Sequence, residues 1–133
     1  MRVTRGQIVS RGLANACPNC GQRTLFPPGA HFTLNHTCAN CGMTLSRPDG
    51  FYLGPLVINY TLTVAGVIVP LILLFAFDVI GGKTAVALCG TGAVLVPLLL
   101  YRRAWGWWMM TYYYFLPHEL PANAPGGRRE ATP

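Results

Sequence analysis

Residues 54–77 read GPLVINYTLTVAGVIVPLILLFAF, and this stretch of 24 residues contains no charged side chain. As an α-helix it is about 36 Å long, which is enough to cross a hydrocarbon core of roughly 30 Å. A second uncharged run, residues 84–101 (TAVALCGTGAVLVPLLLY), follows after a link at 78–83 that contains two glycines. So short a link predicts an antiparallel hairpin of two transmembrane helices at 51–103, with spans at about 54–77 and 80–101.

The composition of the whole chain also indicates a membrane protein. Of the 133 residues, 52% are hydrophobic and only 11% are charged, whereas a soluble domain usually has about a quarter charged residues. Two buried helices of a soluble protein would need a much larger soluble body around them. Neither run contains Asp, Glu, Lys, Arg or His, which argues against a stand-alone transporter or pump.

The basic residues indicate the orientation of the hairpin. Nine of the ten Lys and Arg residues precede the first run or follow the second, and only Lys83 lies in the link. The positive-inside rule therefore predicts a hairpin with both termini in the cytoplasm. The net charge of +6 then favours contact with anionic membrane lipids, and we expect no nucleic-acid partner.

Two C-x-x-C-G motifs, CPNCG and CANCG, lie before the hairpin with 17 residues between their nearest cysteines. This spacing is typical of a four-cysteine zinc site. The residues between the motifs predict two short strands around a PPG turn at 27–29, on a small core of Leu25, Phe26, Phe32 and Leu34. The sequence therefore predicts a short β zinc ribbon at 13–50, following a cytoplasmic N-terminal arm at 1–12. The expected metal ligands are Cys17, Cys20, Cys38 and Cys41.

Other uses of these cysteines are less favoured. A rubredoxin-like iron centre shares the geometry, but closed four-cysteine sites in small ribbons usually hold zinc. Disulfides are disfavoured in a reducing cytoplasm, and four cysteines leave no open position for a catalytic zinc ion. His31 and His36 are not needed as ligands, and Cys89 is expected to be a buried free thiol in the second span.

The segment after Arg102 and Arg103, residues 104–116, reads AWGWWMMTYYYFL and contains seven aromatic residues. Because Trp and Tyr gather where lipid headgroups meet water, it predicts a C-terminal interfacial helix. The alternative is a docking surface for another membrane protein. Residues 117–133, rich in proline and glycine, predict a flexible tail. The residues expected at the interface or docking surface are Arg102, Arg103, Trp105, Trp107, Trp108, Tyr112, Tyr113 and Tyr114.

Several short motifs together resemble the family of small bacterial membrane proteins called domain of unknown function 983. They are RGL at 11–13, the two cysteine motifs, LF at 25–26, RPDGFYLG at 47–54 and INY at 58–60. The resemblance covers about residues 11–116 and implies a cytoplasmic zinc ribbon on a membrane hairpin. It also implies a connection with respiratory complexes, because some relatives are encoded near cytochrome oxidase subunits and assembly factors. The family has no established catalytic residues to carry over.

The four acidic residues are dispersed and suggest no catalytic pair. Asp49 is expected to cap the first membrane helix, and Glu119 and Glu130 are expected to be solvated. We therefore expect no enzyme but a non-catalytic accessory subunit or assembly factor of a larger energy-transducing membrane complex, respiratory or photosynthetic, in which the zinc ribbon is a docking module. The alternative is a membrane-tethered metal-handling or rubredoxin-like redox protein.

Overall fold

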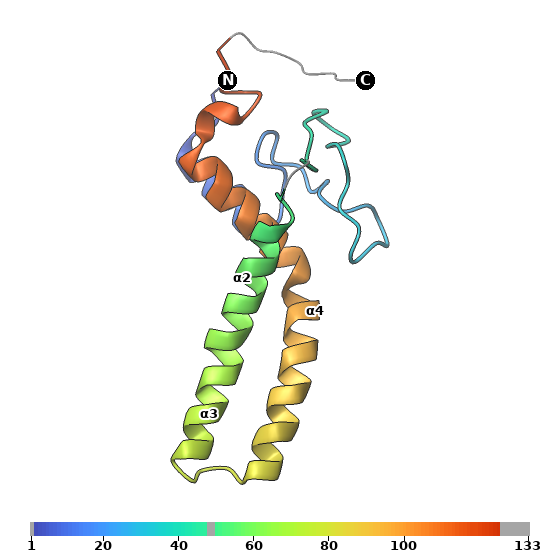
Figure 1. Ribbon diagram of the computed structural model, residues 1–133. Coiled ribbons are helices and arrows are strands. Elements are labelled where there is room, and N and C mark those ends of the chain that lie inside the picture. Colours follow the sequence, from blue (N-terminus) through green and yellow to red (C-terminus); the bar gives the residue numbers. More distant parts are fainter. Residues whose placement is uncertain (1, 48–49, 126–133) are drawn as a thin grey trace.

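Two long helical segments run side by side and are joined by a short turn at one end of the molecule (Figure 1). The computed structural model describes residues 2–47 and 50–125. The first segment consists of α2 (Leu53–Thr63), the π-helical turn η1 (Val64–Ile68) and α3 (Val69–Ala76). The second is the single long helix α4 (Gly82–Phe115). The two apolar helices predicted from the sequence are therefore present. The expected cap Asp49 lies outside the described residues.

Prolines account for the irregularities in both segments. Pro70 has no N–H, and its ring would collide with the carbonyl four residues earlier in a regular α-helix. Just before it, the Val69 N–H donates to the carbonyl of Val64, five residues back, and this wider turn accommodates the proline. In α4, Pro97 lies inside the helix, and the upper part of α4 leans away from the axis of its lower part (Figure 1).

The apolar side chains of the hairpin point outward. Both segments are long and apolar enough to cross a membrane, and in their most apolar stretches 11% and 0% of the residues are buried. Leu99, for example, is 77% exposed. Buried core helices of a soluble protein would have the opposite pattern, so this surface requires an apolar environment outside the chain.

Small and polar residues hold the two segments of the hairpin together. A Cβ atom on Gly92 of α4 would lie 2.7 Å from Cγ1 of Val67, so the backbones approach closely here. The buried Asn59 side chain of α2 donates from Nδ2 to the carbonyl of Pro97 at 2.9 Å, across the hairpin. Thr63 donates to the carbonyl of Asn59 within its own segment. The contact between Asn59 and Pro97 is the kind of interhelical hydrogen bond that stabilises membrane bundles.

The predicted N-terminal arm, before the first cysteine motif, contains a helix, α1 (Arg5–Leu13). Its first turn is closed by a capping box, in which the side chains of Thr4 and Gln7 satisfy each other's backbone N–H groups. The other end packs on α4, where Gly12 lies against Gly106 and Met110. The capping motif was a local signal for this helix.

The predicted interfacial segment at 104–116 is helical as far as Phe115 and continues α4 without a break. A helix of 34 residues is about 51 Å long, well beyond the roughly 30 Å that a bilayer core requires. The protruding end is covered by α1 and by the cysteine-containing loops, so Trp105, Met109 and Tyr113 are buried in one face of α4. The aromatic side chains on that face form a protein core rather than a belt at the lipid surface.

The described residues between α1 and α2 contain no β-strand, so the predicted short β ribbon is not confirmed. The only pairing found there is an isolated antiparallel bridge between Thr37 and Thr44. Three of the four predicted core residues, Leu25, Phe26 and Leu34, are buried. The fourth, Phe32, is 56% exposed and packs its ring 5.4 Å from that of Tyr101.

The first half of the predicted flexible tail is packed. It begins with the 3-10 turn η2 (Pro117–Glu119), and Leu120 is fully buried. Asn123 makes two hydrogen bonds with the backbone of Val3, at 2.7 and 3.0 Å. Residues 117–125 therefore join the start of the chain to the end of α4. The rest of the predicted tail, 126–133, including Glu130, lies outside the described residues.

Candidate metal centre

The two cysteine motifs fold into the same local turn. In each motif the N–H of the glycine donates to the carbonyl of the first cysteine, at 2.8 Å from Gly21 to Cys17 and at 2.8 Å from Gly42 to Cys38. Both glycines have a positive φ, of 80° and 69°, which side chains other than glycine adopt only with strain. The C-x-x-C-G pattern therefore encodes a turn that points two thiols to the same side.

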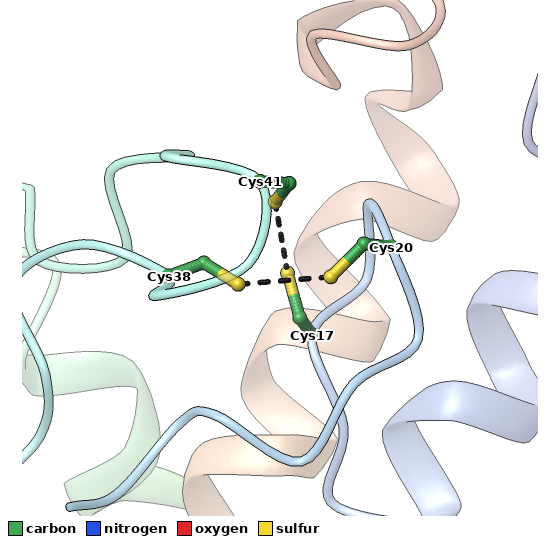
Figure 2. Close-up of side chains that lie close together, drawn as sticks. All are labelled: Cys17, Cys20, Cys38 and Cys41. Atoms are coloured by element: carbon green, nitrogen blue, oxygen red, sulfur yellow. Dashed lines mark hydrogen bonds between the residues drawn. The ribbon is translucent and has the colours of Figure 1, made fainter.

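The two turns bring the four thiols into one cluster, as Figure 2 shows. All four Sγ atoms lie within 4.8 Å of one another. The distance from Cys17 Sγ to Cys41 Sγ is 3.8 Å, and that from Cys20 Sγ to Cys38 Sγ is 3.6 Å. A tetrahedral ion with bonds of about 2.3 Å to sulfur separates its ligands by about 3.8 Å, whereas a disulfide needs about 2.05 Å. The predicted ligand set therefore forms a site that can hold a metal ion such as zinc.

The four thiols have unequal surroundings. Burial opposes the ionisation of Cys38, but hydrogen bonds from the Thr24 hydroxyl and from the backbone of Cys41 and Asn40 outweigh it and lower the pKa of Cys38 to about 6. Burial raises the pKa of Cys17 and, to a smaller extent, that of Cys41. Metals bind thiolates, so the hydrogen bonds to Cys38 favour the form of this thiol that a cation needs.

Two contacts that the sequence analysis did not identify hold the first motif in place. Arg11 of α1 donates from Nη1 to the carbonyls of Pro18 and Asn19, at 2.9 and 2.7 Å. The side chain of Asn19 in turn accepts the N–H of Ala122 at 3.1 Å. Arg11 belongs to the RGL motif of the family resemblance, and its place six residues before Cys17 was the available signal. The metal site is thus attached to both ends of the described chain.

The two histidines between the cysteine motifs and the fifth cysteine are not part of the cluster. His31 and His36 are exposed and are not part of the four-residue cluster. Cys89 is a free, half-buried cysteine in α4. The structure therefore brings together the same four cysteines that the sequence spacing predicts as ligands.

The residues predicted to form a docking surface are divided between core and surface. Trp105 and Tyr113 are buried, so they face the protein itself. Among the exposed residues, Arg102 lies over the ring of Phe26, 4.8 Å from its centroid. The half-buried members of the set are Trp107, Trp108 and Tyr112, and the exposed ones are Arg102, Arg103 and Tyr114. Fewer than half of these side chains are freely available to a partner.

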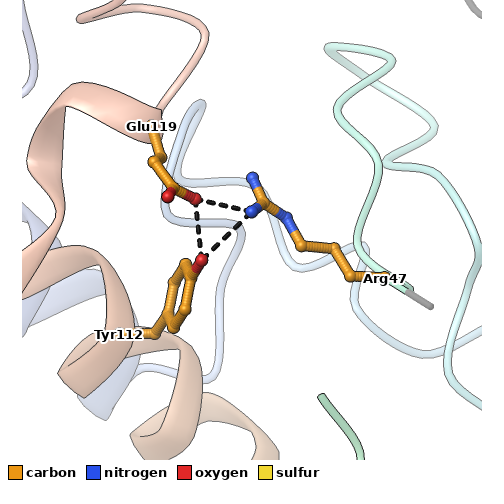
Figure 3. Close-up of polar contacts among 3 residues, drawn as sticks. All are labelled: Arg47, Tyr112 and Glu119. Atoms are coloured by element: carbon orange, nitrogen blue, oxygen red, sulfur yellow. Dashed lines mark hydrogen bonds and ion pairs between the residues drawn. The ribbon is translucent and has the colours of Figure 1, made fainter. Parts of the chain in front are cut away.

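A polar triad connects the loop after the second cysteine motif to α4 and η2 (Figure 3). Arg47 donates to Glu119 at 2.5 Å and to the Tyr112 hydroxyl at 3.1 Å, and Tyr112 donates to Glu119 at 2.7 Å. The hydrogen bond from Tyr112, followed by that from Arg47, lowers the pKa of Glu119. Glu119 was expected to be solvated; its side chain is 28% exposed and is also hydrogen-bonded to Arg47 and Tyr112. The triad attaches the cysteine-containing loops to α4 and η2.

The fold and the site together define a class of protein: a hairpin of two helices able to cross a membrane, with a four-cysteine metal site at its open end. The comparison with protein-family models found the family described as "Protein of unknown function (DUF983)" over residues 29–113. The match covers most of the chain, which therefore belongs to this family, as the sequence motifs predicted. The comparisons with curated proteins and with solved structures found no match.

Proposed function

We propose that this protein is a non-catalytic accessory subunit or assembly factor of a larger energy-transducing membrane complex, respiratory or photosynthetic. The observation that carries the proposal is the continuity between the metal site and the membrane helix. Arg47 joins the metal-binding loops to the protruding end of α4, and Arg11 joins the first cysteine motif to α1. A bound metal would order a body that is rigidly connected to the hairpin, as a docking module requires.

The outward apolar surface of the hairpin supports the same proposal. The side chains that face outward from both segments offer contact area to lipids and to neighbouring membrane helices. In a bacterial inner membrane, the arginines before α2 and after residue 101 would place the metal site and both termini in the cytoplasm. Lys83, at the opposite end of the hairpin, would then be the one cation outside.

We propose that the resident metal is zinc, held by the four thiolates. Zinc would supply no redox chemistry and no open coordination position, so its contribution is structural. The buried side chains between α1 and α2 belong to one cluster with those of α4 and form no core of their own. Small domains of this kind commonly gain stability from the metal. Cys17 and Cys38 are the two buried ligands, and Cys20 and Cys41 are half-buried.

Native gel electrophoresis after extraction in mild detergent tests the proposed role. Wild-type protein is expected to migrate with a large complex, and a Cys17→Ser variant is expected to lose this association together with its metal. Cys89→Ser is the matched control, because it removes a thiol outside the cluster. Migration of the wild type only as a free small species would contradict a stable subunit. Unchanged association of a metal-free Cys17→Ser protein would contradict a docking role for the metal site.

The second candidate is a membrane-tethered metal-handling or rubredoxin-like redox protein. It is favoured by the half-exposure of Cys20 and Cys41, which leaves two thiols accessible from outside. The distances between the sulfur atoms suit iron as well as zinc, because the two metals form bonds of similar length to thiolate. An absorption spectrum of the protein as isolated separates the candidates, because ferric tetrathiolate is coloured and zinc tetrathiolate is colourless.

A further inference from the structure

A loop of the cysteine-containing body, residues 27–33, reaches the end of the hairpin. Its residue Phe32 is 56% exposed, although its ring packs 5.4 Å from the ring of Tyr101 on α4. The Tyr101 hydroxyl also donates to the carbonyl of Phe32, at 3.1 Å. These contacts place the loop at the level of Tyr101, and Figure 1 shows the light-blue segment between α1 and α2 descending toward the hairpin.

A preformed turn holds the loop in this position. The N–H of Ala30 donates to the carbonyl of Pro27 at 3.1 Å, and Gly29 has a φ of 82°. With Pro28 before that glycine, this is the pattern of a type II turn. The two prolines restrict the chain before it folds, so holding the loop costs little conformational entropy. The loop contains no Lys, Arg, Asp or Glu, so no such charged group would lose water in contact with an apolar phase.

The apolar surface of the hairpin ends at the level of Tyr101. Tyr101 is the last residue of the uncharged run in α4. Val94 and Leu98, which share its face of the helix, are 60% and 50% exposed. Phe32 packs on Tyr101 and therefore continues this outward apolar surface at the end of the span.

The charges beside the loop are positive. Arg102 and Arg103 directly follow the uncharged run and are exposed. The Arg102 guanidinium lies 4.8 Å from the ring centroid of Phe26, which directly precedes the loop. Of the two acidic residues that the structure describes, Asp78 lies in the turn between α3 and α4, and Glu119 belongs to the polar triad. An apolar tip with cations beside it fits the surface of a bilayer that contains anionic lipids.

The backbone of the loop limits how deep it can lie in a bilayer. The N–H and C=O groups of a loop do not pair with one another as they do in a helix, and unpaired groups are strongly unfavourable in hydrocarbon. The headgroup layer contains water and phosphate oxygens that can pair with them. It is also the layer in which aromatic side chains of membrane proteins gather. The loop therefore fits the headgroup layer rather than the hydrocarbon.

We propose that the loop at 27–33 inserts Phe32 into the headgroup layer of the bilayer that the hairpin crosses, with Arg102 and Arg103 beside lipid phosphates. The cysteine-containing body then contacts the membrane at a second place besides the hairpin. Removing the exposed part of the Phe32 side chain from water favours the inserted position about tenfold, which corresponds to about 1.4 kcal/mol. This contact requires only that the hairpin lies in a bilayer, and it is independent of the proposed accessory role.

Photocrosslinking of the full-length protein in nanodiscs of phosphatidylglycerol and phosphatidylcholine tests the proposal. The photoreactive residue p-benzoylphenylalanine replaces Phe32, Leu99 or Phe115, one at a time, and mass spectrometry identifies the adducts. Lipid adducts are expected at Phe32 and at Leu99. Because Leu99 is 77% exposed on the hairpin, its adducts report that the hairpin lies in the bilayer.

Phe115 is the matched control, because it is also an exposed phenylalanine, with an exposed fraction of 74%. It ends α4, 14 residues after Tyr101, which is about 21 Å along the helix. Lipid adducts at Phe115 are expected to fall to the level found without illumination.

Lipid adducts at Leu99 without lipid adducts at Phe32 would overturn the proposal and leave the hairpin in the membrane. Adducts of Phe32 with another protein chain in place of lipid would also overturn it, because the loop would then face a protein partner. Lipid adducts as frequent at Phe115 as at Phe32 would overturn it as well. If none of the three positions gives a lipid adduct, the hairpin does not lie in the bilayer and the proposal fails with it.

Hydroxyl-radical labelling of the wild type in the same nanodiscs needs no substitution, so it is decisive even if a variant does not fold. Phe115 is expected to be oxidised about tenfold more than Phe32, the ratio that insertion of the loop provides. Without insertion, exposed fractions of 74% and 56% predict similar labelling of the two residues. Similar labelling would therefore overturn the proposal.

Discussion

Replacing Gly12 by alanine is expected to loosen α1 from α4. A Cβ atom at this position would lie 2.3 Å from Cβ and 2.8 Å from Cγ of Met110, and 3.2 Å from the carbonyl oxygen of Gly106. The Met110 Cβ is attached to the backbone of α4 and cannot turn aside. The two helices would have to separate, and α1 would lose the close contact that attaches it to the body. Gly6, in the same helix, has nothing within 4 Å of the corresponding position.

The size of the destabilisation caused by Gly12→Ala follows from two opposing effects. Forcing an extra methyl group into a packed contact costs about 1–3 kcal/mol, and the short distance to Met110 places Gly12→Ala at the upper end. Alanine gains up to about 1 kcal/mol over glycine inside a helix, and less at Gly12, which is next to the last residue of α1. The net destabilisation of the docked helix is therefore about 2 kcal/mol. Gly6→Ala is expected to stabilise α1 by about 0.5 kcal/mol.

Amide hydrogen exchange, read by mass spectrometry on peptides from α1, measures this difference in the intact protein in detergent. A loss of about 2 kcal/mol accelerates exchange through local opening about 30-fold, because each 1.4 kcal/mol corresponds to a factor of about ten. Gly6→Ala is expected to slow exchange in α1 about twofold. Peptides from the middle of α4 are expected to be unchanged in both variants and serve as the internal reference.

Equal effects of the two substitutions would refute the reasoning, because the contact with Met110 distinguishes them. Slower exchange in Gly12→Ala would refute it more directly. It would mean that alanine stabilises α1 at either position, and that α1 is not packed closely on α4.

Three further predictions concern the metal site and its attachments. Cys17→Ser is expected to lower the metal content from one ion per chain to almost none, whereas Cys89→Ser keeps it, as elemental analysis of both proteins can show. Arg11→Met is expected to weaken the first cysteine motif by about 1–3 kcal/mol through its two lost hydrogen bonds, and faster metal release to a chelator measures this. Because the pKa of Glu119 is lowered in the folded protein, its stabilisation is complete above the unfolded pKa near 4.5 and is lost as the pH falls through the lower folded value. The free energies of unfolding of the wild type and of Glu119→Gln are therefore expected to differ by up to about 1 kcal/mol at neutral pH and to become equal at acid pH.

The hairpin and the metal ligands could be predicted from the sequence because both depend on local properties. A run of 24 uncharged residues must be helical and outward-facing in lipid, whatever the rest of the chain does. The C-x-x-C-G turn is equally local, since Gly21 and Gly42 supply the positive φ that directs the thiols of each motif. That the four thiols of the two motifs meet in one cluster followed from their number and from the chemistry of tetrahedral coordination.

The course of residues 104–125 could not be predicted in the same way. A segment rich in aromatic residues and proline can lie at a membrane surface, or it can be buried beneath a covering helix. Composition alone does not distinguish these two structures. In the structure α1 covers the protruding end of α4, so Trp105 and Tyr113 are core residues. Leu120, in the segment after α4, is also buried. The capping box at Thr4 is a local signal for α1, but it does not indicate where α1 packs.

The sequence by itself determined the two membrane-competent helices, the four metal ligands and the family, because each is carried by neighbouring residues or by a fixed spacing. Only the tertiary structure decided what surrounds the metal site. Arg47 meets Glu119 across 72 positions of the chain, and Val3 meets Asn123 across 120. Such pairs depend on how helices pack, which is the sum of many weak contacts between distant segments and leaves no local pattern to read.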